Sequence, residues 1–150
     1  MEMKNWRLAA LALQIIMMAG CSTQARIAAT RSTEIALGNA RNLARVDCSG
    51  PAECERLWRR TKLYVAQRSA APIRHADETS IETAVPHTFG TIYVWATRTI
   101  DASGVSTIRI KGMCRGMYRA DGNPGWLYQT CAEQIRAVET DFRSFIGAAS

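Results

Sequence analysis

The chain has 150 residues, of which 47% are hydrophobic and 21% are charged, and its formal net charge at pH 7 is +6. This length is that of one ordinary domain, and the composition is that of a globular protein. Together they exclude a multidomain enzyme, a polytopic membrane protein and a disordered or fibrous chain. They indicate no activity.

The first twenty residues have the pattern of an export signal. Lys4 and Arg7 form a short positive region beside one acid, Glu2, and residues 8–19 are an uncharged, largely apolar run. A positive segment followed by an apolar segment of this length is typical of a secretory signal peptide. A membrane-spanning helix needs about 20 apolar residues. We therefore expect residues 1–20 to be a signal peptide.

The apolar run ends in Met18-Ala19-Gly20-Cys21. Two small residues before a cysteine resemble the lipobox of bacterial lipoproteins. The resemblance implies cleavage before Cys21, a diacylglycerol thioether on its thiol and a fatty acyl group such as palmitate on its new amine. Two or more acyl chains anchor a protein stably. In such lipoproteins an Asp directly after the cysteine favours retention in the inner membrane. The residue at this position is Ser22, so the resemblance implies the outer membrane, with the protein facing the periplasm. An ordinary signal peptide with a chance cysteine is the alternative.

Four cysteines remain once Cys21 is lipidated: Cys48, Cys54, Cys114 and Cys131. An even number in an exported chain indicates disulfides, and four cysteines allow three connectivities. We favour Cys48–Cys54 and Cys114–Cys131 because each pair is close in sequence. A zinc site is the alternative, but these spacings do not match common zinc sites. We therefore expect no metal and no cofactor beyond the covalent lipid.

The composition divides the mature chain into a tether and a domain. Residues 21–46 are rich in Ala, Ser, Thr, Asn and Arg, which predicts a lipidated tether with at most a transient helix. Residues 47–150 are expected to form a single globular domain. Between residues 26 and 68 there are nine Lys and Arg against four Asp and Glu, whereas residues 74–150 have eight of each. The basic half suits either contact with anionic lipid or a solvated face. Export argues against a nucleic-acid partner.

Two amphipathic helices are predicted in the domain. The first begins at Pro51, because proline is favoured at the first helical position, and ends near Ser69. The second opens at Asn123-Pro124, a good cap and first-turn pair. Its apolar residues recur at spacings of three or four, which requires a partner surface: Leu127, Cys131, Ile135, Val138, Phe142 and Phe145.

Strands are expected between the two helices. Residues 73–76, 80–85, 90–100 and 105–114 are short strand-like runs, the last two of which are joined by a hairpin loop at residues 101–104. This order predicts an α+β fold, a two-layer sandwich of an antiparallel three- to four-stranded sheet and two helices, stapled by disulfides.

A second resemblance covers most of residues 48–145. Cys48-Ser49-Gly50-Pro51-Ala52-Glu53-Cys54, followed by Arg56 and Trp58 and later by Ile81-Glu82-Thr83, is similar to a motif in a group of small proteobacterial outer-membrane lipoproteins. The resemblance implies the same fold and location. The spacing between Cys114 and Cys131 is longer than that group leads us to expect, and no activity is carried over from it.

The sequence offers two candidate sites. His75, Asp77, Glu78 and Glu82 form the one cluster of titratable residues that a hydrolase or a metal site would use, but nothing supplies a nucleophile beside them. We interpret this cluster as an exposed turn and expect no catalytic residue. The alternative function centred on His75 is that of a small-ligand-binding or hydrolytic envelope protein.

The other candidate is the Gly-rich segment 112–126. It carries Arg115, Tyr118, Arg119 and Trp126, and residues of these types dominate binding hot spots. A structural loop with Trp126 docked on the core is the competing interpretation. The preferred function is a non-catalytic, membrane-anchored envelope lipoprotein, an accessory or assembly factor that binds a periplasmic or membrane protein through this segment.

Overall fold

A computed structural model describes the backbone of residues 2–147 and the side chains of residues 23–147. The chain contains three helices and five strands in these residues, in the order α1, β1, α2, β2, β3, β4, β5, α3. It divides into two compact units, Met1–Ile35 and Ala36–Ser150. The bounds are α1 Glu2–Leu43, β1 Arg45–Cys48, α2 Pro51–Arg68, β2 Ile73–Ala76, β3 Ser80–Thr83, β4 Ile92–Ile100, β5 Ser106–Cys114 and α3 Tyr128–Gly147.

The strands form one antiparallel sheet in the order β1-β5-β4-β3-β2. The hairpin of β4 and β5 is its centre, with a register that runs from Ile92 opposite Cys114 to Ile100 opposite Ser106. The α+β class is confirmed, but the sheet has five strands rather than three to four. The additional strand is β1, which pairs with β5 from Arg45 opposite Arg109 to Cys48 opposite Ser106.

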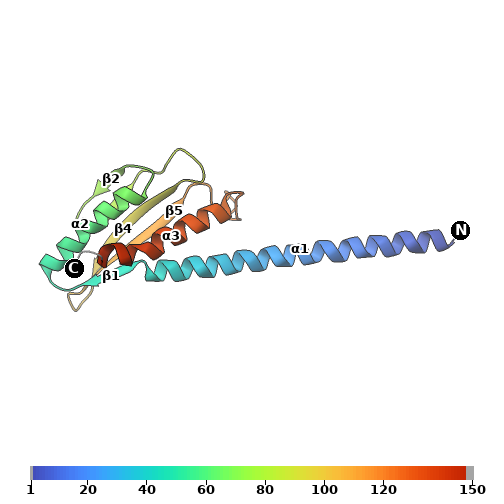
Figure 1. The fold of residues 1–150 in the computed structure, drawn as a ribbon, viewed down its shortest axis with the longest axis horizontal. Helices are drawn as coiled ribbons and strands as arrows, with labels where there is room; N and C mark the ends of the chain where they lie inside the picture. The colour runs from blue at the N-terminus through green and yellow to red at the C-terminus, as the bar shows by residue number, and fades with distance from the viewer. Residues whose placement is uncertain (1, 148–150) are drawn as a thin grey trace. The chain divides into compact units, whose positions relative to one another are not determined.

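Helices α2 and α3 lie side by side on one face of the sheet (Figure 1). The core between them and the sheet is centred on Tyr64, whose ring lies 5.4 Å from that of Phe142 and 4.9 Å from that of Phe145. The Tyr64 hydroxyl donates a hydrogen bond to the Val138 carbonyl at 2.6 Å. Burial is the main cause that raises the pKa of Tyr64 to about 12. The opposite face of the sheet carries polar and aromatic side chains.

The two domain helices differ in how well the sequence locates them. The first begins at Pro51, as predicted, and ends at Arg68, one residue before Ser69. The second begins at Tyr128 rather than at Asn123-Pro124. Pro124 is instead bridged to Tyr118 within the preceding loop, so the residues read as a helix start belong to a turn.

The structure places more of the N-terminal segment in the domain than the sequence predicts. Helix α1 continues to Leu43, and Leu37, Ala40 and Ala44 are buried. The compact unit begins at Ala36, so the expected boundary at residue 47 falls within β1. Nε of Arg41 also donates to the buried Glu139 of α3 at 3.3 Å.

Cys21 and the predicted signal peptide, residues 1–20, lie outside the residues whose side chains are described, and their assignment stays a prediction. In the described part of the chain, no helix combines the length and the apolar character needed to cross a membrane.

Both favoured disulfides are present. Cys48 and Cys54 are joined with their Cα atoms 5.2 Å apart, and this bond links the end of β1 to the first turn of α2. Cys114 and Cys131 are joined with their Cα atoms 5.5 Å apart, and this bond links the end of β5 to α3. Each disulfide therefore ties the sheet to one of the two helices that cover it.

Candidate partner-binding surface

The segment between β5 and α3 is folded onto itself rather than extended. The Gly125 amide donates to the Met117 carbonyl at 2.8 Å, and the Arg119 amide donates to the Asn123 carbonyl at 2.9 Å. At the turn, Oδ1 of Asp121 accepts a hydrogen bond from the Asn123 amide at 3.0 Å. This bond is the main cause that lowers the pKa of Asp121. The stapled loop, residues 115–127, thus has a backbone fixed by its own hydrogen bonds.

Two glycines allow the backbone of the stapled loop to approach its neighbours closely. Gly116 has φ +79°, and a Cβ there would overlap the ring of Phe89. A Cβ on Gly125 would lie 2.7 Å from the Gly116 carbonyl oxygen. At Gly116 only glycine avoids both the strained φ and the overlap, and at Gly125 only glycine avoids the overlap, so these positions account for part of the glycine content of the segment.

One side of the stapled loop is anchored in the core. Met117 is buried in a cluster with Tyr128, Cys131 and Ile135 of α3. The ring of Tyr118 packs edge-on against that of Tyr128, with centroids 5.7 Å apart. The stapled loop is therefore held against α3 by apolar contacts as well as by the disulfide between the residues that flank it.

The other side of the stapled loop presents aromatic side chains to solvent. Trp126 is 87% exposed, and Tyr118 is 46% exposed. Phe89, which lies against Gly116 from the segment between β3 and β4, is 57% exposed. We call Phe89, Tyr118 and Trp126 the aromatic tip. These residues belong to the segments that precede β4 and follow β5, at the end of this strand pair opposite its hairpin loop.

The four residues predicted to bind a partner have different surroundings. Trp126 and Tyr118 are exposed members of the aromatic tip. Arg115 is half-buried: it donates from Nη1 to the Pro86 carbonyl at 2.6 Å and stacks on the ring of Phe89 at 4.8 Å, so its position supports the tip. Arg119 pairs with Asp121 through Nη2 and Oδ2 at 2.9 Å, and both side chains are largely exposed. Whether these four residues bind a partner stays a prediction.

Sequence reasoning missed Phe89. It stands alone in a segment of Pro, His, Thr and Gly, without the periodic pattern that marks a strand or a helix. The signal that could have found it is a solitary large aromatic residue beside a glycine in a polar connection, since such a residue is either docked or presented.

Within the His75 cluster, His75 and Asp77 take part in the turn between β2 and β3, and Glu82 lies opposite His75 in the strand register. Nε2 of His75 contacts Oδ2 of Asp77 at 2.7 Å. Oδ1 of Asp77 accepts hydrogen bonds from the Thr79 amide at 2.7 Å and the Ser80 amide at 2.8 Å. These bonds hold the pKa of Asp77 well below its usual range, and the bond from the Thr79 amide has the largest effect. Asp77 therefore closes the turn between β2 and β3, and among the described residues no group of three or more potential ligands could hold a metal ion.

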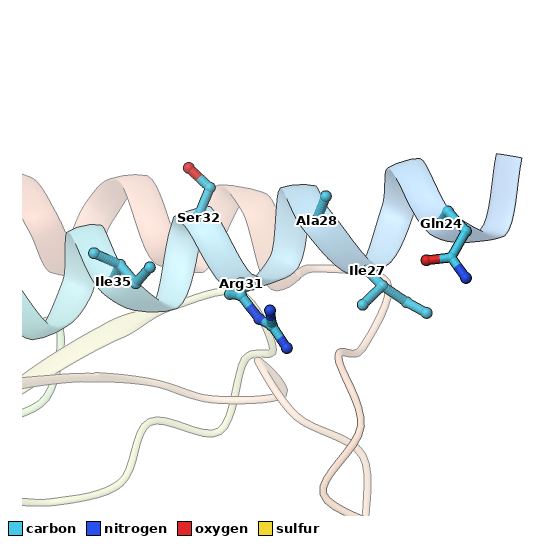
Figure 2. A pocket seen from close by; sticks show the side chains of 6 residues that line it. All are labelled: Gln24, Ile27, Ala28, Arg31, Ser32 and Ile35. Atoms are coloured by element: carbon cyan, nitrogen blue, oxygen red, sulfur yellow. The ribbon is translucent and has the colours of Figure 1, made fainter. Parts of the chain in front are cut away.

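A hollow on α1 has lining side chains that do not form a catalytic or metal-binding set. Its side chains come from a single helix face at spacings of one, three and four, and Figure 2 shows them along α1: Gln24, Ile27, Ala28, Arg31, Ser32 and Ile35. Arg31 is the one charged side chain among these six. A catalytic site needs functional groups that converge on one point from more than one helix face or segment.

Comparison with known proteins leaves the assignment to the residues themselves. No protein-family model, no curated protein and no solved structure matches this chain.

Proposed function

We propose that this protein is a lipid-anchored, non-catalytic accessory or assembly factor of the cell envelope, held in the outer membrane and facing the periplasm. It binds a periplasmic or membrane protein partner through the aromatic tip. The observation that carries the proposal is Trp126, which is 87% exposed on a loop that a disulfide and backbone hydrogen bonds hold in shape.

An exposed aromatic tip on a braced loop has the features of a binding hot spot. Trp and Tyr are enriched among the residues that contribute most to protein interfaces. Contacts formed by a rigid loop avoid part of the entropy cost of ordering side chains and backbone on binding. A stack of Arg115 on Phe89 holds a third ring beside the loop, which widens the apolar area available to a partner.

The location rests on different residues from the binding surface. Met18-Ala19-Gly20-Cys21 supports lipidation of Cys21, and the two disulfides suit an oxidising compartment such as the periplasm. A lipid anchor would keep the aromatic tip within reach of envelope proteins, which raises its effective concentration toward them.

The test is recovery of the partner from intact cells. The tagged full chain is expressed at native level and cross-linked, and the adducts of wild type, Trp126→Ala and Ile100→Ala are compared by mass spectrometry. Ile100 is 68% exposed at the far end of β4, so its variant removes an exposed apolar side chain away from the tip. We expect one dominant envelope partner with wild type and Ile100→Ala, and its loss with Trp126→Ala. Recovery of the same partner by all three would contradict the proposal.

A further inference from the structure

A second candidate site lies on the face of the sheet that α2 and α3 leave uncovered. There, β4 and β5 and the last turn of α1 surround a hollow of about 370 Å³. The hollow belongs entirely to the compact unit Ala36–Ser150. Its lining residues are Arg41, Asn42, Trp95, Ala96, Thr97, Arg109, Ile110 and Lys111. We call this the basic hollow.

The basic hollow is strongly positive. Arg41, Arg109 and Lys111 line it, and no carboxylate is among its described lining residues. Arg41 contacts the buried Glu139, and Lys111 also favours the charged form of that carboxyl group. Glu139 thus interacts with two of the three cations, and within the described residues neither Arg109 nor Lys111 forms a salt bridge. The positive charge of Arg109 and Lys111 is therefore available to a negatively charged ligand.

The strand register increases this excess at the edge of the hollow. Arg45 of β1 lies directly opposite Arg109 of β5, and both side chains are exposed. Like charges in directly opposed positions of an antiparallel pair destabilise a sheet. Asp47, the nearest acid on β1, instead accepts a hydrogen bond from the Thr107 hydroxyl at 2.6 Å. An anion bound beside Arg109 would relieve the repulsion that the fold tolerates.

A fixed aromatic ring forms part of the wall. Nε1 of Trp95 donates to the Thr83 carbonyl at 3.0 Å. The ring of Tyr93 packs edge-on against the ring of Trp95, with centroids 6.3 Å apart. Trp95 lies opposite Lys111 in the register of β4 and β5. A ligand with a short aliphatic stem and a terminal carboxylate would place its stem on the Trp95 ring and its charge at Lys111 and Arg109.

These features favour an acidic side chain over a lipid surface. The cations surround a concave hollow, and the ring of Trp95 is tied to the backbone and only partly exposed. A planar membrane reaches protruding cations and free aromatic rings, whereas a projecting side chain enters a hollow. We infer that the basic hollow binds a Glu- or Asp-rich peptide segment. The inference rests on the proposed function in one respect: the segment belongs to the protein partner.

The experiment measures binding of a fluorescein-labelled hexaglutamate peptide to the purified full chain in non-ionic detergent by fluorescence polarisation. Arg109→Glu with Lys111→Glu removes the two cations of the hollow that form no salt bridge among the described residues. Arg136→Glu with Arg143→Glu makes the same change of charge on the exposed side of α3 and is the matched control. Denaturant unfolding of all three proteins confirms that each is folded.

We expect the hollow variant to bind the peptide at least about tenfold more weakly than wild type, since both charge contacts are replaced by repulsion, and the control to bind as wild type does. Added salt should weaken wild-type binding. Equal losses in both variants, or no binding by wild type, would overturn the inference. So would binding of the wild type to phosphatidylglycerol vesicles that needs Arg109 and Lys111 when peptide binding does not.

The same variants separate this inference from the proposed function. If the aromatic tip is not a partner site, Trp126→Ala leaves partner recovery unchanged while hexaglutamate binding still requires Arg109 and Lys111. If the basic hollow is not a peptide site, hexaglutamate binding is lost or unspecific while partner recovery still requires Trp126. Each failure therefore has its own pattern.

Discussion

Replacement of Trp126 by alanine should leave the fold almost as stable as it is. A fully buried aromatic side chain removes roughly 150–250 Å² from water. Trp126 is 87% exposed, so it buries about an eighth of that, or about 20–30 Å². At about 25 cal/mol per Å² the loss in unfolding free energy is about 0.5–0.8 kcal/mol. Trp58 is the contrast, because it is 6% exposed and its Nε1 donates to the Asp77 carbonyl at 2.8 Å.

The assay is denaturant unfolding of the wild type, Trp126→Ala and Trp58→Ala. Truncation of a buried tryptophan should cost about 3–5 kcal/mol, several times the loss expected for Trp126. Circular dichroism reports the transition for all three without relying on the fluorescence of the residues removed. A loss of about 3 kcal/mol for Trp126→Ala would mean that the side chain docks on the core, and the aromatic tip would then be structural.

The remaining predictions concern the disulfide, a buried acid and the anchor. Replacing Cys114 and Cys131 together by alanine should lower the unfolding free energy by about 3 kcal/mol, because their sequence separation is 17; an unchanged denaturation midpoint would contradict this. The pKa of Glu139 is raised from 4.5, chiefly by burial, so the folded state holds this proton more tightly than the unfolded chain. Stability should therefore fall as pH rises from about 4.5 through the raised pKa, and Glu139→Gln should lack this decline; parallel profiles of unfolding free energy against pH would refute it. Cys21→Ala should leave the precursor uncleaved or the protein soluble, and a processed protein of wild-type size that still partitions into the detergent phase would rule out the lipid anchor.

The elements that the sequence predicts well are those whose side chains repeat with the period of the structure. Helix α2 follows from Pro51 and its apolar face, and the β4–β5 hairpin from its β-branched residues and turn. Strand β1 was missed because a four-residue strand with two charged residues has no pattern that separates it from a linker. The start of α3 was placed too early because a proline serves a turn as well as a helix.

The candidate surface was predictable in its composition but not in its shape. The Gly-rich segment with Tyr118 and Trp126 marks a loop that contains large aromatic residues, and the structure adds which of them are exposed. Arg115 supports the aromatic tip, and Phe89 belongs to it, because the segment after β5 contacts the segment before β4, which is far from it in sequence. The added positive charge at the edge of the basic hollow depends on the register that places Arg45 opposite Arg109, which no local pattern in the sequence reveals.

The most direct test of the central claim is site-specific photo-cross-linking in intact cells. A photoreactive amino acid is placed at position 126 of the full chain, or at position 100 as the exposed control on the far end of β4. The account predicts one dominant envelope-protein adduct from position 126 and none above background from position 100. The same adducts from both positions, or none from position 126, would contradict partner binding at the aromatic tip.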